Sequence, residues 1–345
     1  MTKATSPNDS SMPRITLAIP EYNEEANLPE VYQRVTAVID SLPDYEFEIL
    51  LIDNCSQDAT ERLSREFIAR DNRWRYLRFS RDFGPEASLA AGTYYATGDA
   101  LIFLPSDLQE PIELIPTMIE KWQEGYDMVY GTVSSRKDES FLMTLGAKLA
   151  YRLIYWLSDI KIPPNATFFR LISRRVIEAV LRCDEQNRYF CGLVHWVGFR
   201  QCALPYKRAP RVHGESYSSP LFLVGHALNA LTAFSVRPLQ LASIVGILAM
   251  GLSAAGALIY LTLVILVHFG MLDMVPPPPG WTTIVLLILF FGGFQFLFLG
   301  ILGKYLSHVY KEVKQRPLWV VQSTSGFPPE QDPLKSIHRF SQHGS

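Results

Sequence analysis

The chain has 345 residues, of which 48% are hydrophobic and 19% are charged, so it can form one large domain and a membrane part. Its formal net charge of −2 gives no overall electrostatic reason to expect a nucleic-acid partner. The cysteines lack the Cys-x-x-Cys spacing of zinc sites and redox pairs, and we expect them to stay reduced in a cytoplasmic domain. They are Cys55, Cys183, Cys191 and Cys202.

Strand-like and helix-like segments alternate through the N-terminal half of the chain. The strand-like segments are short apolar runs, whereas the helix-like segments carry apolar residues at helical spacing, as at Leu28, Val31 and Val35. This alternation predicts an α/β domain with a mostly parallel sheet and helices on both faces. The expected strands are 15–19, 48–52, 76–79, 100–104 and 127–130, and the expected helices are 28–41, 60–69, 87–96 and 112–123.

Two uncharged apolar runs, 239–267 and 281–303, lie in the C-terminal third of the chain. A bilayer core takes about 20 apolar residues of helix, so each run is long enough to span it. The loop between them contains Pro276 to Pro279 and no Lys or Arg, whereas basic residues flank the pair. The positive-inside rule therefore predicts a multi-pass membrane protein with both termini in the cytoplasm. The alternative is a pair of buried core helices. The flanking basic residues are Arg237, Lys304, Lys311, Lys314 and Arg316.

Changes of composition suggest the domain organisation. Two further segments are apolar with a polar edge and are expected to lie at the membrane interface as amphipathic helices, although packing against the sheet is an equal alternative. The tail after Pro317 is rich in Ser, Pro and Gln and is predicted to be loosely ordered. The predicted parts are a flexible N-terminus (1–13), the α/β domain (14–218) with one amphipathic helix (141–157), a second amphipathic helix (219–237), the membrane pair (238–305) and the cytoplasmic tail (306–345).

Polar motifs follow three of the expected strands, at 20–25, 53–60 and 106–111. Ligands of parallel sheets bind at the carboxyl ends of the strands, so these motifs are expected to gather around one site. Together with Asp82 to Ala87, Phe169 to Leu171, 192–198, 208–217 and the membrane pair, they resemble the polyisoprenyl-phosphate branch of the family 2 glycosyltransferases, which have the GT-A fold. This branch includes dolichyl-phosphate mannose synthases and the bacterial undecaprenyl-phosphate glucose and aminoarabinose transferases.

The resemblance implies a nucleotide-sugar donor (a UDP- or GDP-sugar), a polyisoprenyl phosphate acceptor, a homo-oligomer and a place in the cell (inner) membrane. It also implies a divalent cation, Mg²⁺ or Mn²⁺, which would bridge the donor phosphates. Arginine side chains near the membrane are suited to binding the acceptor phosphate. The implied roles are donor binding by Pro20, Tyr22, Glu24, Asp53 and Asn54, metal binding by Asp107 and Gln109, catalysis by Asp107 and Arg170, and acceptor-phosphate binding by Arg208, Arg211, Ser216 and Tyr217.

The chain departs from the family pattern at four positions. Pro105 replaces the first Asp of the usual Asp-x-Asp, which predicts a weakened metal site. Phe168 replaces an Asp that is a proposed base in relatives. A phosphate monoester has a second pKa of about 6, so its attacking oxygen is already anionic at neutral pH and needs no base. The other departures are Asn54 for Asp and Pro85 for Lys.

The sequence therefore predicts an inverting transferase that moves one sugar onto a polyisoprenyl phosphate at the cytoplasmic leaflet. Because the departures cluster at the chemistry, a catalytically impaired relative that binds nucleotide-sugar or lipid phosphate as a partner subunit is the alternative. A processive polysaccharide synthase is disfavoured, because the Gln-x-x-Arg-Trp motif and further membrane helices are absent from the sequence.

Overall fold

The structure is a computed structural model of the whole chain. It describes residues 12–133, 163, 165–183, 185, 186, 188–209 and 280–334, with isolated positions between 239 and 269. The chain forms two compact units. One unit contains the sheet with its helices and the returning C-terminal segment, and the other contains the long helix α10 (Trp281–Lys314).

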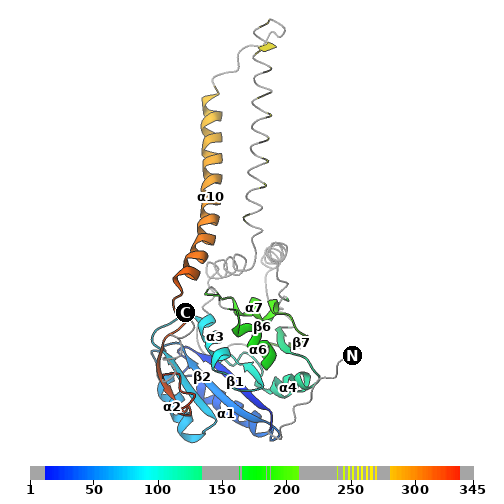
Figure 1. Cartoon of the computed structure of the whole chain (residues 1–345), viewed down its shortest axis with the longest axis vertical. Coiled ribbons are helices and arrows are strands. Elements are labelled where there is room, and N and C mark those ends of the chain that lie inside the picture. Colours follow the sequence, from blue (N-terminus) through cyan, green and yellow to red (C-terminus); the bar gives the residue numbers. More distant parts are fainter. Residues whose placement is uncertain are drawn as a thin grey trace, which may run out of the picture. The chain divides into compact units, whose positions relative to one another are not determined.

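The described residues build one eight-stranded sheet in the order β7-β5-β6-β4-β1-β2-β3-β8 (Figure 1). Its centre consists of four neighbouring parallel strands, in agreement with the predicted parallel sheet. The central strands are β1 (Arg14–Glu21), β2 (Glu46–Asp53), β3 (Trp74–Phe79) and β4 (Ala100–Phe103), and the outer strands are β5 (Met128–Val133), β6 (Ala166–Ser173), β7 (Gln201–Tyr206) and β8 (Val321–Ser325).

Two of the outer strands add antiparallel pairs to the mostly parallel sheet. β6 runs antiparallel to both β4 and β5, and β8 runs antiparallel to β3, while β7 and β5 are parallel. The sequence did not reveal β6 as a strand because Arg170 interrupts its apolar residues, although the structure buries that arginine completely. A buried charge in the middle of a strand defeats a prediction based on hydrophobic pattern.

Helices cover both faces of the sheet, as predicted. The apolar stripe of α1 packs on one face, in a core shared with residues of α2 and α4. On the other face, α3 lies so close that a Cβ at Gly92 would be 2.9 Å from the Phe103 ring. The helices of this unit are α1 (Leu28–Asp40), α2 (Thr60–Arg70), α3 (Pro85–Tyr95), the short η1 (Ile112–Leu114), α4 (Ile115–Gln123), α6 (Arg174–Leu181) and α7 (Phe190–Trp196).

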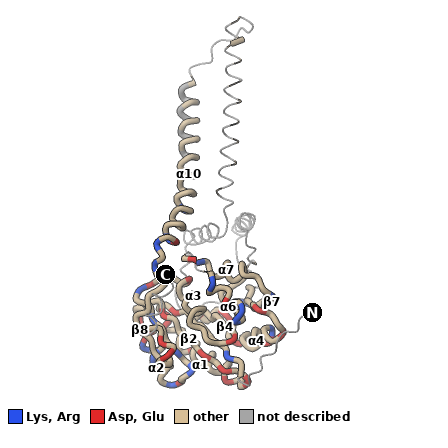
Figure 2. Tube along the Cα trace, viewed as in Figure 1, with Lys and Arg blue, Asp and Glu red and all other residues tan. Residues whose placement is uncertain are grey.

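The predicted membrane segments remain predictions. Over the part of the chain that the structure describes, no helix combines the length and the hydropathy of a membrane span. Helix α10 includes the second apolar run, and its charged residues lie toward its C-terminal end (Figure 2). The first run is described only at isolated positions, and the predicted amphipathic helices, 141–157 and 219–237, lie outside the described residues.

The described part of the C-terminal tail, up to residue 334, contains a strand of the sheet, so the predicted loose order is wrong for that part. Residues of β8 pair with β3, with Ser325 opposite Tyr76, and Trp319 stacks on Phe79 with ring centroids 6.3 Å apart. Without β8, the hydrogen-bonding groups along the outer side of β3 would form an open sheet edge. The polar composition of the tail fits a partly exposed edge strand, so composition alone misidentified it.

We expect Gly326, just after β8, to be required for this pairing. Its φ is +78°, and a Cβ there would lie 2.6 Å from the Trp74 carbonyl oxygen. Gly326→Ala should therefore lower the free energy of unfolding by more than the roughly 1–2 kcal/mol that a left-handed backbone alone costs. Gly198→Ala is the matched control, because Gly198 has a φ of +80° and a Cβ there would have no atom within 4 Å. Equal losses for the two variants in thermal unfolding would contradict the close packing of β8.

Candidate active site

Hydrogen bonds and strand pairing connect the carboxyl ends of β1, β2 and β4 at one edge of the sheet. In register, Glu21 lies opposite Asp53, and the Asn54 amide donates to the Glu21 carbonyl at 3.0 Å. The Ser106 hydroxyl donates to the carbonyl oxygen of Pro20, also at 3.0 Å. The structure thus brings together the three polar motifs that sequence analysis expected to meet.

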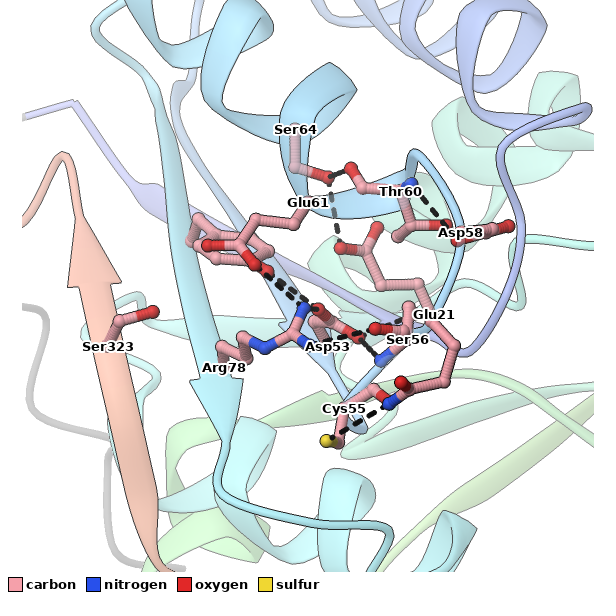
Figure 3. Close-up of polar contacts among 12 residues, drawn as sticks. Glu21, Asp53, Cys55, Ser56, Asp58, Thr60, Glu61, Ser64, Arg78 and Ser323 are labelled. Atoms are coloured by element: carbon pink, nitrogen blue, oxygen red, sulfur yellow. Dashed lines mark hydrogen bonds and ion pairs between the residues drawn. The ribbon is translucent and has the colours of Figure 1, made fainter.

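Asp53, at the end of β2, is completely buried and receives four hydrogen bonds (Figure 3). Its Oδ1 accepts from the amide and hydroxyl of Ser56 at 2.7 and 2.6 Å. Its Oδ2 accepts from the Tyr76 hydroxyl at 2.6 Å and from the Arg78 guanidinium at 2.7 Å. Burial and the neighbouring Asp53 charge raise the pKa of Tyr76, so its phenol keeps the proton that it donates.

This saturation changes what Asp53 can do for a donor. A carboxylate has about four lone-pair directions, and Asp53 uses them on its own loop and on β3. A nucleoside base would have to displace one of these donors. In this structure, therefore, Asp53 organises the loop, and its predicted contact with the base stays a prediction.

The loops after β1 and β2 are bound to each other by side chain to backbone hydrogen bonds. The Asn23 amide donates to the Ser56 hydroxyl at 2.9 Å, and the Glu24 amide donates to the Thr60 hydroxyl at 2.9 Å. Asn23 and Cys55 have φ values of +55° and +68°, a strained backbone that such contacts hold in place. Tyr22 and Glu24, predicted to line the nucleoside pocket, are partly exposed on this loop.

Asn54 connects β2 to the loop after β3. Its side-chain amide donates to the Asp82 carboxylate, and its oxygen accepts from the Phe83 amide at 2.9 Å. An Asp at position 54 would place two carboxylates against each other, because only an amide can donate here. The departure from the family pattern at Asn54 thus has a structural reason.

The motif after β4 supplies the candidate metal ligands. Asp107 is 8% exposed, and its Oδ1 accepts from the Gln109 amide at 3.3 Å. Between them, Leu108 has a φ of +57°, which is rare for a branched residue and indicates a constrained turn. Pro105 stands before this turn, so the motif has no carboxylate on that side.

Glu110 provides a second carboxylate that was not among the predicted site residues. It is 2% exposed, and burial followed by the Asp107 charge raises its pKa to about 7. Its Oε1 accepts from the Tyr206 hydroxyl at 3.1 Å and lies 3.2 Å from the Arg208 guanidinium. Glu110 belongs to the motif that the sequence singled out, but nothing in the sequence showed its side chain turning toward Asp107.

These residues fit a hard divalent cation, although no group of three or more His, Cys, Asp or Glu in the described part of the chain is arranged around a metal position. Mg²⁺ takes oxygen ligands and needs only one or two protein carboxylates when substrate phosphates and water complete its shell. Asp107, Glu110 and the amide oxygen of Gln109 offer that donor set. The Oε2 atom of Glu110 is one of several buried side-chain atoms without a hydrogen-bond partner among the described residues, and it belongs to the carboxyl group whose pKa the Asp107 charge raises.

Arg170, predicted to be catalytic, is completely buried on β6. Its Nη2 donates to the Thr167 carbonyl at 2.6 Å and to the Cys191 sulfur at 3.0 Å. Burial raises the pKa of Glu86 to about 7 in spite of the opposing effect of Arg170, and burial lowers the pKa of His195 to about 4. The Arg170 side chain is buried among residues of β6 and α7, and its predicted contact with substrate stays a prediction.

Of the four residues predicted to bind the acceptor phosphate, the structure describes one. Arg208 is described, with 41% of its side chain exposed beside Glu110. Arg211, Ser216 and Tyr217 lie outside the described residues. Pro85 begins α3, where the missing N–H of proline costs no helical hydrogen bond. The side chain of Phe168 is partly buried on β6.

Comparisons with known proteins show the family to which the chain belongs. A family model described as Glycosyl transferase family 2 matches residues 16–181. The "Uncharacterized glycosyltransferase YkcC" of Bacillus subtilis (strain 168) is 37% identical over 311 residues, covering 90% of this chain and 94% of that protein. The "Prophage bactoprenol glucosyl transferase homolog" of Escherichia coli (strain K12) is 37% identical over 311 residues, covering 90% of this chain and 98% of that protein.

Among solved structures, glucosyl-3-phosphoglycerate synthase from Mycobacterium tuberculosis, in complex with Mn²⁺ and UDP-glucose, is similar with a TM-score of 0.39. It is 19% identical and covers 62% of this chain and 75% of that chain. The chain belongs to glycosyl transferase family 2 and is a glycosyltransferase. Its mixed sheet, with helices on both faces, is of the GT-A type that the resemblance implied.

We expect Asn54→Asp to destabilise the site. The variant loses a buried donor and gains a charge beside Asp82, which together should cost about 1–3 kcal/mol of unfolding free energy at pH 7. The loss should shrink toward pH 4, where one carboxyl of the pair takes up a proton and donates again. Asn23→Asp is the matched control, because the Asn23 Oδ1 acts as an acceptor, from the Gln57 amide at 2.7 Å. Chemical denaturation across this pH range measures both, and a pH-independent loss in Asn54→Asp would contradict the assigned contact.

Proposed function

We propose that this glycosyltransferase moves one sugar from a nucleotide-sugar to a polyisoprenyl phosphate, with inversion, at the cytoplasmic face of the membrane. The observation that carries the proposal is the place of Arg208, a phosphate-binding type of side chain, 3.2 Å from a carboxylate of the candidate metal motif. The near full-length similarity to relatives named bactoprenol glucosyl transferase supports the same acceptor.

The donor would bind across the fastened strand ends. Pro20, Tyr22 and Glu24 would line the nucleoside side, with Asp53 and Asn54 holding the loops in shape. Asp107, Glu110 and Gln109 would hold a divalent cation, which when bound would neutralise the diphosphate and ease its departure. The donor is a UDP- or GDP-sugar in this proposal.

The acceptor phosphate would attack the anomeric carbon directly. A phosphate oxygen forms the new bond to that carbon while the bond to the nucleoside diphosphate oxygen breaks, so one displacement inverts the configuration. The attacking oxygen is already anionic near neutral pH, since the second pKa of a phosphate monoester is about 6. Phe168, in place of a base, is compatible with this chemistry. Arg208 and Arg211 would orient the phosphate.

We also propose that the chain crosses the inner membrane twice, with both termini in the cytoplasm, and that it forms a homo-oligomer. The support for membrane crossing is the absence of charge from 239–267 and 281–303 and the basic residues that flank the pair. The exposed apolar side chains on the described part of α10, including Ile288, Phe296 and Leu299, suit a lipid environment. Interfacial packing of 141–157 and 219–237 belongs to the same proposal.

Membranes containing the full chain should convert one labelled nucleotide-sugar of a panel into an organic-extractable lipid-linked sugar when a short polyprenyl phosphate is supplied. Asp107→Asn should reduce this transfer by at least about a hundredfold, because the cation contributes several kcal/mol of charge stabilisation. Gln57→Ala, at an exposed position near the same edge, is the control and should retain the parent rate. Donor binding without transfer from any nucleotide-sugar would instead favour the partner-subunit alternative.

The topology predicts that a single cysteine at Asp273, introduced into a chain with its own four cysteines replaced, faces outward. A membrane-impermeant thiol reagent added to intact cells should label Asp273→Cys. A cysteine at Ser323, in the C-terminal tail, should react only after the membrane is breached. Reversed labelling of the two positions would overturn the topology.

A further inference from the structure

Arg208, just after β7, forms an ion pair with Glu110 of the candidate metal motif. The Arg208 Nη2 lies 3.2 Å from Glu110 Oε1, and the Glu110 side chain is 1% exposed while that of Arg208 is 41% exposed. The pair therefore joins a buried carboxylate to a cation whose other side faces solvent. Arg208 is also the described residue to which the proposed function assigns the acceptor phosphate.

The segment carrying Arg208 is fastened to the motif. The Ala209 amide donates to the Gln109 carbonyl at 3.1 Å, and the Tyr206 hydroxyl donates to Glu110 Oε1 at 3.1 Å. Contacts on both sides of position 208 hold Arg208 against Glu110. The pair is thus a property of the fold around it rather than a chance surface contact.

The charges explain why an arginine is there. Glu110 is nearly buried and belongs to the same motif as the nearly buried Asp107, and a carboxylate out of water needs a compensating cation beside it. In this structure Arg208 supplies that charge. A divalent metal ion bound by the same carboxylates would supply it as well, and the buried Glu110 Oε2, without a hydrogen-bond partner among the described residues, marks where it would contact Glu110.

We propose that Arg208 and the divalent cation exchange at Glu110, so that cation binding releases Arg208 to bind the acceptor phosphate. A divalent cation at Oε2 would take up the negative charge of Glu110 and repel the guanidinium at Oε1, which would weaken the ion pair with Arg208. The half-exposed guanidinium, once released, presents its donors to solvent at the edge of the motif. The inference rests on the proposed function and adds an order to it, with cation and donor before acceptor.

Such an exchange makes cation and phosphate binding mutually dependent. By linkage, whatever factor Mn²⁺ adds to phosphate affinity, phosphate must add to Mn²⁺ affinity. The exchange thus disfavours capture of acceptor by an enzyme that has no donor. A static role for Arg208, as a permanent neutraliser of Glu110, predicts no such dependence.

The first test measures Mn²⁺ affinity by electron paramagnetic resonance of the purified full chain in lipid nanodiscs. If Arg208 competes with the metal, Arg208→Ala should bind Mn²⁺ about tenfold more tightly than the parent. Lys207→Ala removes the same charge one residue away, from an exposed side chain, and should change the affinity by less than about twofold. Equal changes in the two variants, an unchanged or weaker affinity in Arg208→Ala, or no Mn²⁺ binding by the parent would overturn the exchange.

The second test measures binding of geranyl phosphate, with inorganic phosphate in parallel to separate recognition of the lipid phosphate from recognition of any phosphate. Saturating Mn²⁺ should tighten geranyl phosphate binding to the parent about tenfold. In Glu110→Gln, where Arg208 is no longer held, binding should already be tight without Mn²⁺ and gain little from it. Mn²⁺-dependent binding that persists unchanged in Glu110→Gln would contradict the proposal.

The two tests distinguish this inference from the proposed function. Transfer of sugar together with an unchanged Mn²⁺ affinity in Arg208→Ala would remove the exchange and leave the transferase proposal standing. Coupled Mn²⁺ and phosphate binding without transfer from any nucleotide-sugar would support the exchange and contradict the transferase proposal. Tightening of inorganic phosphate binding alone, without that of geranyl phosphate, would show a phosphate site that is not the acceptor site.

Discussion

The buried carboxylate of Asp53 holds the edge of the sheet at which the active site is built. Taking a charge out of water is costly unless hydrogen bonds and opposite charge replace the solvent. Here the loop after β2 and the side chains of Tyr76 and Arg78 replace it, and Arg78 also reaches Glu61 of α2 at 2.9 Å. The loop after β2, strand β3 and helix α2 are thereby held together, because moving β3 would take away two of the groups that compensate the buried charge.

A second buried carboxylate, Glu110, differs from Asp53 in how completely its oxygens are hydrogen-bonded. Asp53 uses all of its acceptor positions within the fold, whereas Glu110 keeps a buried oxygen without a partner among the described residues and relies on a half-exposed arginine for its charge. A saturated carboxylate is suited to holding structure. An incompletely satisfied one is suited to exchanging partners, which is the basis for assigning Glu110 and Arg208 to ligand binding.

The departures from the family pattern become understandable in this setting. Asn54 is a donor to Asp82, which an aspartate could not be. Pro85 occupies the first turn of a helix, where proline is well tolerated. For Pro105, the structure offers Glu110 as a carboxylate beside Asp107. These substitutions therefore do not by themselves indicate a silent relative, since each has a local physical explanation compatible with transfer.

The sequence by itself determined the central parallel strands, the helices on both faces and the motifs that meet at the strand ends. Those features follow from local periodicity and from the rule that parallel strands bring their carboxyl ends to one edge. The tertiary structure decided the rest: the antiparallel β6 with its buried Arg170, the pairing of the polar β8 with β3, the saturation of Asp53, and the approach of Glu110 to Asp107 and Arg208. Each of these depends on contacts between segments far apart in the chain, where a charge or a polar strand is stabilised by partners that no local pattern encodes.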